Sequence, residues 1–340
     1  MAKLRVGVIG CGSIAVHRHI PEYAAHPDVE LVAFCDIVKE RAEKMAATYG
    51  GRAYQSYEEM LEAEKPDAVS VCTPNAFHAP ASLAAIRRKI HVLCEKPMAI
   101  SAEEAEAMIR EAKENGVQLM IGHNQRMMPP HVKAKEILES GRLGRVLTFR
   151  TAFAHGGPES WSADGADSWF FRKKEAFVGA LGDLGVHKID LLQWLIGEPI
   201  VEVSAMTATL QKKADVDDNA VIVARTRSGA IGTVTAGWTH APGEDNSTVL
   251  YCENGILEIG TDPESQVIVR FRDGNVERHS TGKIATNEEG GQTHSGVIDE
   301  FVGALLEGRE NAVPGEEGWS ALRVVLAAIR SAEEKVSVTV

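Results

Sequence analysis

The segment VGVIGCGSIA, close to the N-terminus, constrains the fold more than any other feature of the sequence. Gly10, Gly12 and Ala15 form a G-x-G-x-x-A pattern between an apolar run and a stretch with helical spacing. In this pattern the first glycine permits a tight turn, the second lets a pyrophosphate approach the backbone, and the small third residue lets helix and strand pack closely. The segment therefore predicts the first strand and helix of a dinucleotide-binding α/β domain. The alternative is a turn that binds no ligand.

Strands and helices continue to alternate up to residue 122. The apolar runs are LRVGVIG, VELVAFCD, DAVSVCT, IHVLCEKP and VQLMIGHN, and continuous apolar runs are typical of strands buried in a parallel sheet. Among the helical stretches between them, 101–116 has the clearest ends, with Ser101 as N-cap, Glu104 in the capping-box position and Gly116 at the C-terminus. We therefore predict an N-terminal Rossmann domain, a doubly wound parallel sheet, over residues 1–122.

The sequence changes character after residue 122. Longer strands follow one another there, with hairpin-type turns at CENG and RDGN. The helices expected in this part of the chain are 130–140, 180–196, one near 293–307 and one near 317–334. A loop as long as 155–178 is usually functional or mobile in a compact domain. We predict a second, α+β domain over residues 123–340, with a large and mostly antiparallel open sheet.

Composition restricts the partners of the chain. The formal net charge is −12, which argues against nucleic acid or an anionic membrane, because both attract clustered Lys and Arg. No apolar run approaches the ~20 residues that span a bilayer, and the N-terminus does not resemble a signal peptide. The five cysteines have no CxxC spacing, so we expect reduced thiols in the cytoplasm rather than disulfides or a zinc site.

An acidic residue follows the glycine pattern at the distance that dinucleotide-binding domains require. Asp36 ends the second apolar run, where its carboxylate would accept hydrogen bonds from the ribose hydroxyls and repel a 2′-phosphate. This favours NAD over NADP, although the nearby Lys39 and Arg41 weaken the preference. Together with Asp36, the cofactor-binding residues expected from this part of the chain are Gly10, Gly12, Ser13 and Ile14.

Polar residues also follow the later strands of the first domain, at the sheet edge where open α/β sheets bind their ligands. The alternatives are a helix N-cap for Thr73 or Asn75, a structural His78 and a solvated charge for Lys96. Pro97 follows this lysine and its peptide bond is a candidate for the cis form. The residues expected to contact the cofactor from these strand ends are Thr73, Pro74, Asn75, His78, Glu95, Lys96 and Asn124.

The segment GALGDLGVHKIDLL places two polar residues on an apolar helix. Asp183 and His187 are four residues apart and therefore share a helix face. A pair of this kind is suited to proton transfer, to a core contact in which the two side chains satisfy each other, or to metal binding. A third ligand with convincing spacing is missing from the sequence, so we expect no metal.

The segments GCGSIA, CTPN..H, CEKP and GDLGVHKIDL, taken together, resemble the glucose–fructose oxidoreductase/inositol dehydrogenase (Gfo/Idh/MocA) family over essentially the whole chain. The resemblance implies oxidation of one hydroxyl of a cyclic sugar or polyol with NAD(P). It also implies dimers or tetramers that assemble through the open sheet of the second domain, so this domain would serve both substrate binding and oligomerisation.

The same resemblance implies three catalytic residues. His187 would take the hydroxyl proton as hydride leaves the same carbon, and Lys96 would hydrogen-bond the reacting oxygen. Asp183 would hold His187 or bind a neighbouring hydroxyl. All three would also contact the substrate.

Other candidate residues rest on weaker patterns, and a structural role is at least as expected for each. Further substrate contacts are expected from Arg126, His155, Trp169 and Arg172, while Trp161, Trp238 and His294 are additional candidates and the run His17, Arg18 and His19 is interpreted as structural. The outer face of the open sheet should be apolar if it is an interface, and Val201, Val203, Ile231 and Val234 are the residues proposed for it.

The leading hypothesis is a cytoplasmic NAD-dependent dehydrogenase of a cyclic polyol or sugar that resembles an inositol, an aldose or an anhydrosugar. Two alternatives remain open. One is a redox-neutral sugar-modifying enzyme that retains its NAD, and the other is a non-catalytic NAD(P)-binding regulator.

Overall fold

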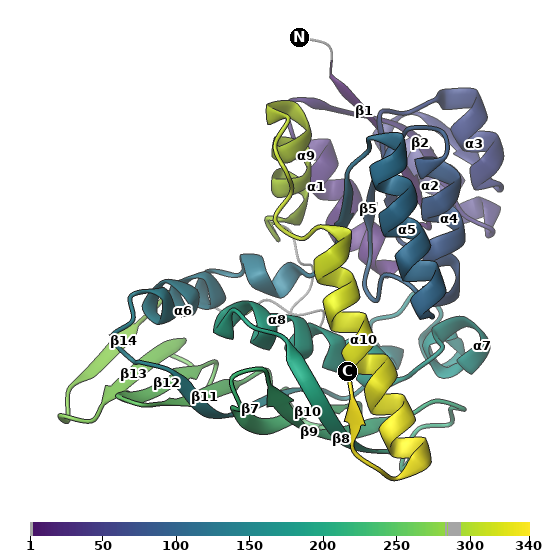
Figure 1. Cartoon of the computed structure of the whole chain (residues 1–340). Coiled ribbons are helices and arrows are strands. Elements are labelled where there is room, and N and C mark those ends of the chain that lie inside the picture. Colours follow the sequence, from purple (N-terminus) through teal and green to yellow (C-terminus); the bar gives the residue numbers. More distant parts are fainter. Residues whose placement is uncertain (1–2, 283, 285–293) are drawn as a thin grey trace.

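The computed structural model describes residues 3–282, 284 and 294–340 and consists of two domains, one above the other in Figure 1. The first domain contains a six-stranded sheet with the order β3-β2-β1-β4-β5-β6, in which every pair of neighbours is parallel. Its strands are β1 (Leu4–Ile9), β2 (Val29–Cys35), β3 (Arg52–Tyr54), β4 (Ala68–Val71), β5 (His91–Cys94) and β6 (Leu119–Ile121). The predicted doubly wound parallel sheet is therefore confirmed.

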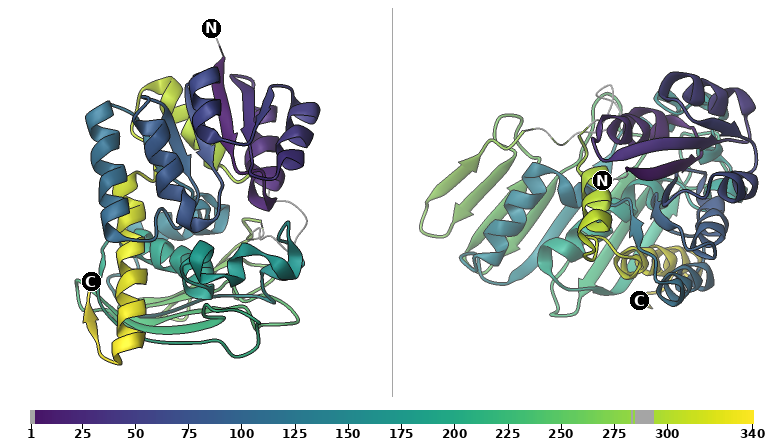
Figure 2. Two further views of the ribbon diagram at one scale, coloured as in Figure 1. Left: turned by 90° about the vertical axis from the view of Figure 1, so that its right-hand side faces the viewer. Right: turned by 90° about the horizontal axis from the view of Figure 1, so that it is seen from above.

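Helices cover both faces of this sheet (Figures 1 and 2). They comprise a π-helical turn, η1 (Ala15–His19), which continues into α1 (Ile20–Ala25), and the helices α2 (Lys39–Tyr49), α3 (Tyr57–Glu64), α4 (His78–Ile86) and α5 (Ala102–Asn115), with a 3-10 turn, η2 (Asn75–Phe77), ahead of α4. The caps of α5 are those predicted, because Ser101 accepts a hydrogen bond from the Glu104 amide and Gly116 ends the helix in the left-handed conformation. The short strand β3 and the helix α3 were not predicted.

The glycine loop lies at the switch point of this sheet, where the strand order reverses between β1 and β4. Gly10 has φ +91°, and a Cβ atom on it would lie 2.6 Å from the carbonyl oxygen of Cys72, which follows β4. Only glycine fits this close approach of two strand ends. The crevice outside the carboxyl ends of such strands is where open α/β sheets bind ligands.

The second domain contains a nine-stranded sheet with the order β14-β13-β12-β11-β7-β10-β9-β8-β15. Its strands are β7 (Val146–Ala154), β8 (Ile200–Ala208), β9 (Asn219–Thr226), β10 (Ile231–Gly237), β11 (Thr248–Cys252), β12 (Gly255–Ile259), β13 (Val267–Phe271), β14 (Val276–His279) and β15 (Val338–Thr339). All neighbours are antiparallel except β7 and β10, which are parallel. This agrees with the mostly antiparallel sheet predicted.

Helices pack on the face of this sheet that is turned toward the first domain (Figure 1). They are α6 (Pro129–Glu139), α8 (Val186–Ile196) and the long α10 (Gly315–Glu334), and short turns and the one-turn α7 (Lys173–Ala176) occupy the loop between β7 and α8. The expected helix 180–196 begins as a π-helical turn, η7 (Leu181–Gly185), which leads directly into α8.

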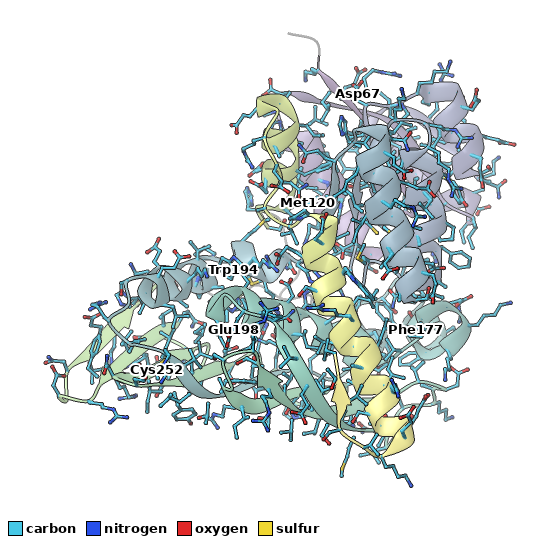
Figure 3. The ribbon with its side chains drawn as sticks, in the orientation of Figure 1. Asp67, Met120, Phe177, Trp194, Glu198 and Cys252 are labelled. Atoms are coloured by element: carbon cyan, nitrogen blue, oxygen red, sulfur yellow. The ribbon has the colours of Figure 1, made fainter. Side chains whose placement is uncertain are left out.

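The C-terminal part of the chain ties the two domains together. Helix α9 (Val297–Glu307) packs against the first domain, where Val297 and Phe301 belong to the same core as the parallel sheet. Helix α10 then runs from the first domain down to the second sheet (Figures 1 and 3), beginning beside Met120 of β6 through a bridge to Pro314. Residue 293, where the helix near 293–307 was expected to begin, lies outside the described residues.

The outer face of the second sheet carries no helix within the described residues (Figures 1 and 2). Its side chains alternate in burial along β9, where Val221 and Val223 are exposed. Val203 and Val234, which the sequence suggested for this face, are instead buried against the helices. Ile231 is exposed as expected and Val201 is half-buried. Within the described residues, the longest apolar helical stretch falls short of a membrane span.

Candidate active site

A cavity of about 550 Å³ opens between the two domains, at the carboxyl ends of β1, β2, β4 and β5. The second domain closes it with the end of β7, the loop that follows and the turn η7. The expected residues that line this cavity are Gly10, Gly12, Ser13, Ile14, Asp36, Thr73, Pro74, Asn75, His78, Glu95, Lys96, Asn124, His155, Trp161, Trp169, Arg172, Asp183 and His187. One cavity thus joins the glycine loop to the Asp183–His187 helix.

Lys96 and Asp183 form an ion pair across the domain boundary. The Lys96 Nζ atom donates to Asp183 Oδ1 at 2.9 Å and to the Asp183 carbonyl oxygen at 3.0 Å. The other carboxylate oxygen of Asp183 accepts a hydrogen bond from the indole nitrogen of Trp238 at 3.2 Å. Asp183 therefore orients the lysine, while Trp238, which does not line the cavity, fixes the carboxylate from behind.

Asp217 sets the position of Asp183 in the turn η7. Its carboxylate accepts hydrogen bonds from the backbone amides of Gly179 and Leu181, both at 2.8 Å, and so satisfies amides that the helix start leaves unpaired. Gly179 must be small, because a Cβ atom there would lie 1.8 Å from the Asp217 carbonyl oxygen. The segment GxLGD, residues 179–183, therefore determines the orientation of the helix face that carries Asp183 and His187.

His187 lies one turn beyond Asp183 and is 8% exposed. Phe153 and His123 flank its ring, with centroids at 5.9 and 6.2 Å, and its Nδ1 atom is buried without a hydrogen-bond partner. Burial, reinforced by the charge of Lys96, lowers the pKa of His187 well below its usual value. The ring is therefore a neutral imidazole at neutral pH, able to accept a proton.

Glu95 lies beneath the lysine in a buried polar cluster. It accepts from His19 Nε2 at 2.9 Å and lies 3.9 Å from Arg18. Burial alone would raise its pKa, but the His19 hydrogen bond and the charges of His19, Arg18 and Lys96 lower the pKa of Glu95 to about 2. Glu95 is thus a fixed anion that holds the base of the cavity together.

The glycine loop and the strand ends fit a dinucleotide. A Cβ atom on Gly12 would have nothing within 4 Å, so the space that a pyrophosphate would enter is open. Asp36 is fixed by the amides of Cys11 and Val38, each at 2.8 Å, at the place where a ribose would bind. Thr73 and Asn124 each have a buried side-chain oxygen without a hydrogen-bond partner, which a bound cofactor would satisfy.

The remaining strand-end residues have structural contacts as well. Asn75 donates to the Ala176 carbonyl oxygen in the second domain at 2.9 Å. The two ring nitrogens of His78 lie 2.7 and 2.8 Å from the carbonyl oxygens of Pro97 and Thr73. The Lys96–Pro97 peptide bond is cis, as the sequence suggested.

The loop after β7 crosses the nucleotide end of the cavity. Ser13 Oγ of the glycine loop donates to the Trp161 carbonyl oxygen at 3.0 Å, and Arg41 forms a salt bridge with Asp164. Behind these contacts Trp169 stacks on Phe170 with centroids 3.9 Å apart. The second domain therefore contributes a cluster of aromatic side chains to the lining of the cavity, among them Trp161, Trp169 and Phe170.

Arg126 does not reach the cavity, contrary to the sequence-based expectation. Its guanidinium is buried in bidentate contact with Asp190 of α8, at 2.6 and 2.8 Å, and bonds Glu317 of α10 at 2.7 Å. The arginine therefore joins three elements behind the site. His294 is exposed and also lies away from the cavity.

Several charged residues that line the cavity were not assigned to the site from the sequence, among them Arg18 and Asp164. Arg18 is 4% exposed, and its Nε atom has no hydrogen-bond partner. Its position one turn after the glycine loop is a signal that was available, since residues 14 and 18 share a helix face. Asp164 stands in a loop of Gly, Ser and Asp residues with no distinguishing local pattern. Within the described residues no group of three or more His, Cys, Asp or Glu side chains forms a metal site.

These features define a two-domain, dinucleotide-dependent enzyme with a Lys–Asp–His cluster at the domain boundary. Family models match both domains, residues 4–123 to the oxidoreductase family with an NAD-binding Rossmann fold and residues 131–258 to the GFO/IDH/MocA C-terminal domain. The chain therefore belongs to the Gfo/Idh/MocA family and is an NAD(P)-dependent dehydrogenase.

Individual relatives extend over the same length. The chain is 29% identical over 341 residues to myo-inositol 2-dehydrogenase of Thermotoga maritima, with 98% of each chain covered. It is 28% identical over 322 residues to levoglucosan dehydrogenase of Pseudarthrobacter phenanthrenivorans, covering 84% of this chain and 81% of that protein. A levoglucosan dehydrogenase structure in complex with NADH has a TM-score of 0.87 and 26% identity, with 99% of both chains covered.

Proposed function

We propose that this protein oxidises a hydroxyl-bearing carbon of a cyclic polyol or neutral sugar with NAD, in a reversible reaction. The observation that carries the proposal is the single cavity in which the glycine loop, Lys96 and His187 meet. Oxidation of CH–OH to C=O releases one hydride and one proton, so the site needs an acceptor for each.

His187 is the proton acceptor. It is neutral at neutral pH, because burial lowers its pKa, and it lines the cavity beside Lys96. In the reverse direction the imidazolium returns the proton to the carbonyl oxygen. Positioned general bases of this kind contribute roughly 10²- to 10⁴-fold to a rate.

Lys96 stabilises the oxygen from which the proton leaves. Its Nζ atom already donates two hydrogens to Asp183, at 2.9 and 3.0 Å, which leaves the third ammonium hydrogen for a substrate oxygen. A donor fixed in a cavity shielded from water stabilises developing negative charge more than water does. Asp183 is the positioning residue for this lysine and a candidate acceptor for a neighbouring hydroxyl.

The first domain holds the cofactor. Gly10, Gly12, Ser13 and Ile14 would surround the pyrophosphate, and Asp36 would accept hydrogen bonds from the ribose hydroxyls. The residues that would line the nicotinamide half are Thr73, Pro74, Asn75, His78, Glu95, Lys96 and Asn124. NAD, when bound there, supplies the hydride acceptor. We propose this division of labour for residues 1–122 and 123–340, with most of the substrate contacts in the second part.

The charges of the cavity favour a neutral substrate. Arg172 is paired with Glu175 and with the Asp167 carbonyl oxygen, and Lys96 is paired with Asp183. Trp169 offers a flat face on which a sugar ring can stack. The relatives named for inositol and levoglucosan act on neutral cyclic polyols of this kind, which supports the same substrate class here.

We also propose that the protein is cytoplasmic and works as a dimer or tetramer. All five cysteines are unpaired thiols, as is usual in a reducing compartment. The outer sheet face exposes Met206, Val221, Val223 and Ile231, and Met206 and Val221 are direct cross-strand neighbours. A contiguous apolar patch of this kind is typical of an interface.

The test is the change of nicotinamide absorbance when purified protein is mixed with NAD and a panel of inositols, aldoses and anhydrosugars. We expect reduction with a neutral member of the panel and a loss of roughly 10²-fold or more in His187→Ala. The exposed His17 provides the matched control, and His17→Ala should react at the wild-type rate.

Reduction that persists unchanged in His187→Ala would contradict the proposal, as would NAD binding without turnover of any neutral sugar. The second domain contacts the glycine loop and α2 through Ser13 and Arg41. These contacts favour the redox-neutral form of the proposed reaction, in which NAD stays bound through the whole cycle. In that case NAD would co-purify with the protein, and an added ketose or keto-sugar would be needed to regenerate it.

A further inference from the structure

Two cations next to Asp36 leave the choice between NAD and NADP open at the level of sequence. Lys39 and Arg41 follow the second strand, where basic residues accommodate a 2′-phosphate in NADP-dependent enzymes. The structure shows that acidic residues of the chain already pair with both. Lys39 contacts Glu43 one helical turn away on the exposed face of α2, at 2.9 Å. Arg41 lines the cavity and is paired with Asp164.

The Arg41 partner comes from the other domain. Asp164 belongs to the loop after β7, and the Ser13–Trp161 hydrogen bond holds the same loop against the glycine loop. Asp36 also lines the cavity, so this end of the cavity carries the Asp36 carboxylate in addition to the Arg41–Asp164 pair. The local charge at this end of the cavity is negative, although its sequence contains an arginine.

We propose that Asp164 is a cofactor-selectivity residue, which favours NAD over NADP by occupying Arg41. The proposal rests on the proposed function, because it concerns the dinucleotide that this site would bind. A 2′-phosphate carries a charge of about −1.5 to −2. To use Arg41 it would have to displace Asp164 and then remain near two carboxylates. The ribose hydroxyls of NAD are neutral, and their binding requires no such displacement.

Asp164 also has a mechanical role, since it holds the loop over the site. Loss of that role alone would weaken NAD and NADP equally, because both share the adenosine, pyrophosphate and nicotinamide. The ratio of the two dissociation constants therefore separates selectivity from loop closure. Binding is the appropriate readout, because it requires neither the sugar substrate nor turnover.

The experiment measures the dissociation constants of NAD and NADP by titration calorimetry for the full chain and five variants. In Asp164→Asn we expect the ratio Kd(NADP)/Kd(NAD) to fall by about tenfold, which corresponds to ~1.4 kcal/mol. Asp164→Glu keeps the charge and should keep the wild-type ratio. Asp167→Asn is the matched control, because Asp167 lines the same cavity from the same loop while the Arg41 salt bridge runs to Asp164.

The last two variants are Arg41→Ala alone and Arg41→Ala combined with Asp164→Asn. If Asp164 acts through Arg41, Arg41→Ala and the double variant should have the same ratio Kd(NADP)/Kd(NAD). An unchanged ratio in Asp164→Asn, or an equal fall with and without Arg41, would overturn the proposal. If wild-type protein binds neither dinucleotide, the proposed function itself fails. If it binds NAD but Asp164→Asn leaves Kd(NADP)/Kd(NAD) unchanged, only the role of Asp164 is refuted.

Discussion

At the scale of single residues, the two glycines of the nucleotide loop have different surroundings. A Cβ atom on Gly10 would lie 2.6 Å from the Cys72 carbonyl oxygen, and its φ of +91° is unfavourable for any other residue. A Cβ atom on Gly12 would meet nothing within 4 Å. The first glycine is therefore required by the fold, and the second is required only if a pyrophosphate approaches it.

This difference gives a paired prediction. Gly12→Ala should fold with a free energy of unfolding within about 0.5 kcal/mol of wild type but bind NAD at least about tenfold more weakly. Gly10→Ala should lose roughly 1–3 kcal/mol of stability through strain. Denaturant unfolding and NAD titration of the two variants measure both quantities. Wild-type NAD affinity in Gly12→Ala would show that the loop does not hold the pyrophosphate.

The protonation state of His187 gives a pH prediction. Its folded-state pKa is lowered by burial and then by the charge of Lys96, so the neutral, proton-accepting form persists as the pH falls through ~6.5, the usual histidine value. The oxidation rate kcat/KM should therefore stay flat from about pH 8 through ~6.5 and decline only at lower pH. A pH–rate profile with a midpoint near ~6.5 would contradict this assignment.

At the scale of elements, the start of the Asp183–His187 helix depends on one carboxylate. Asp217 accepts from the Gly179 and Leu181 amides, so Asp217→Ala should cost about 1–2 kcal/mol and lower kcat by displacing Asp183. The neighbouring Asp218 accepts from the amides of residues 210–212 and is the matched control.

Asp218→Ala should lose comparable stability while its kcat remains near the wild-type value. Thermal unfolding and steady-state kinetics of both variants test the pair. Equal losses of kcat would show that the helix start is not specifically coupled to the reaction.

Most helices and strands could be predicted because their caps and apolar patterns lie within the segment itself. The caps of α5 are an example, since Ser101 and Gly116 determine them within one segment. The edge strand β3 has three residues and no buried side chain, so its sequence carries no strand-like alternation. The parallel pairing of β7 with β10 was also missed, because register between distant strands depends on tertiary packing.

The site was predictable to the extent that its residues lie at strand ends or share a helix face. Lys96 and His187 line the cavity for these reasons. Contacts between distant segments were not predictable. Arg126 follows the last strand of the first domain, yet pairs with Asp190 and Glu317 because α8 and α10 pack over it. Nothing near Asp164 in the sequence indicates that it meets Arg41.

At the scale of the whole molecule, the second sheet is covered on one face only. Core side chains such as Ile222 point to the helices, while Met206, Val221 and Val223 are exposed between 47% and 82%. Leaving these side chains in water is unfavourable by ~25 cal/mol per Å² of apolar surface. A second copy of the chain, packed on the same face, would remove this cost through a symmetric contact.

Charges placed in this patch should therefore dissociate the assembly. In Val221→Glu/Val223→Glu the two carboxylates would be buried without partners at such an interface, which is strongly unfavourable. Sedimentation should show wild-type protein as a dimer or tetramer and the double variant as a smaller species with an unchanged far-UV spectrum. Leu306, which is 52% exposed on α9 of the first domain, gives the control, and Leu306→Glu should sediment as wild type. A monomeric wild-type protein would contradict the proposed assembly. An unchanged mass in the double variant would exclude this face as the contact, because an interface here would have to bury two unpaired carboxylates.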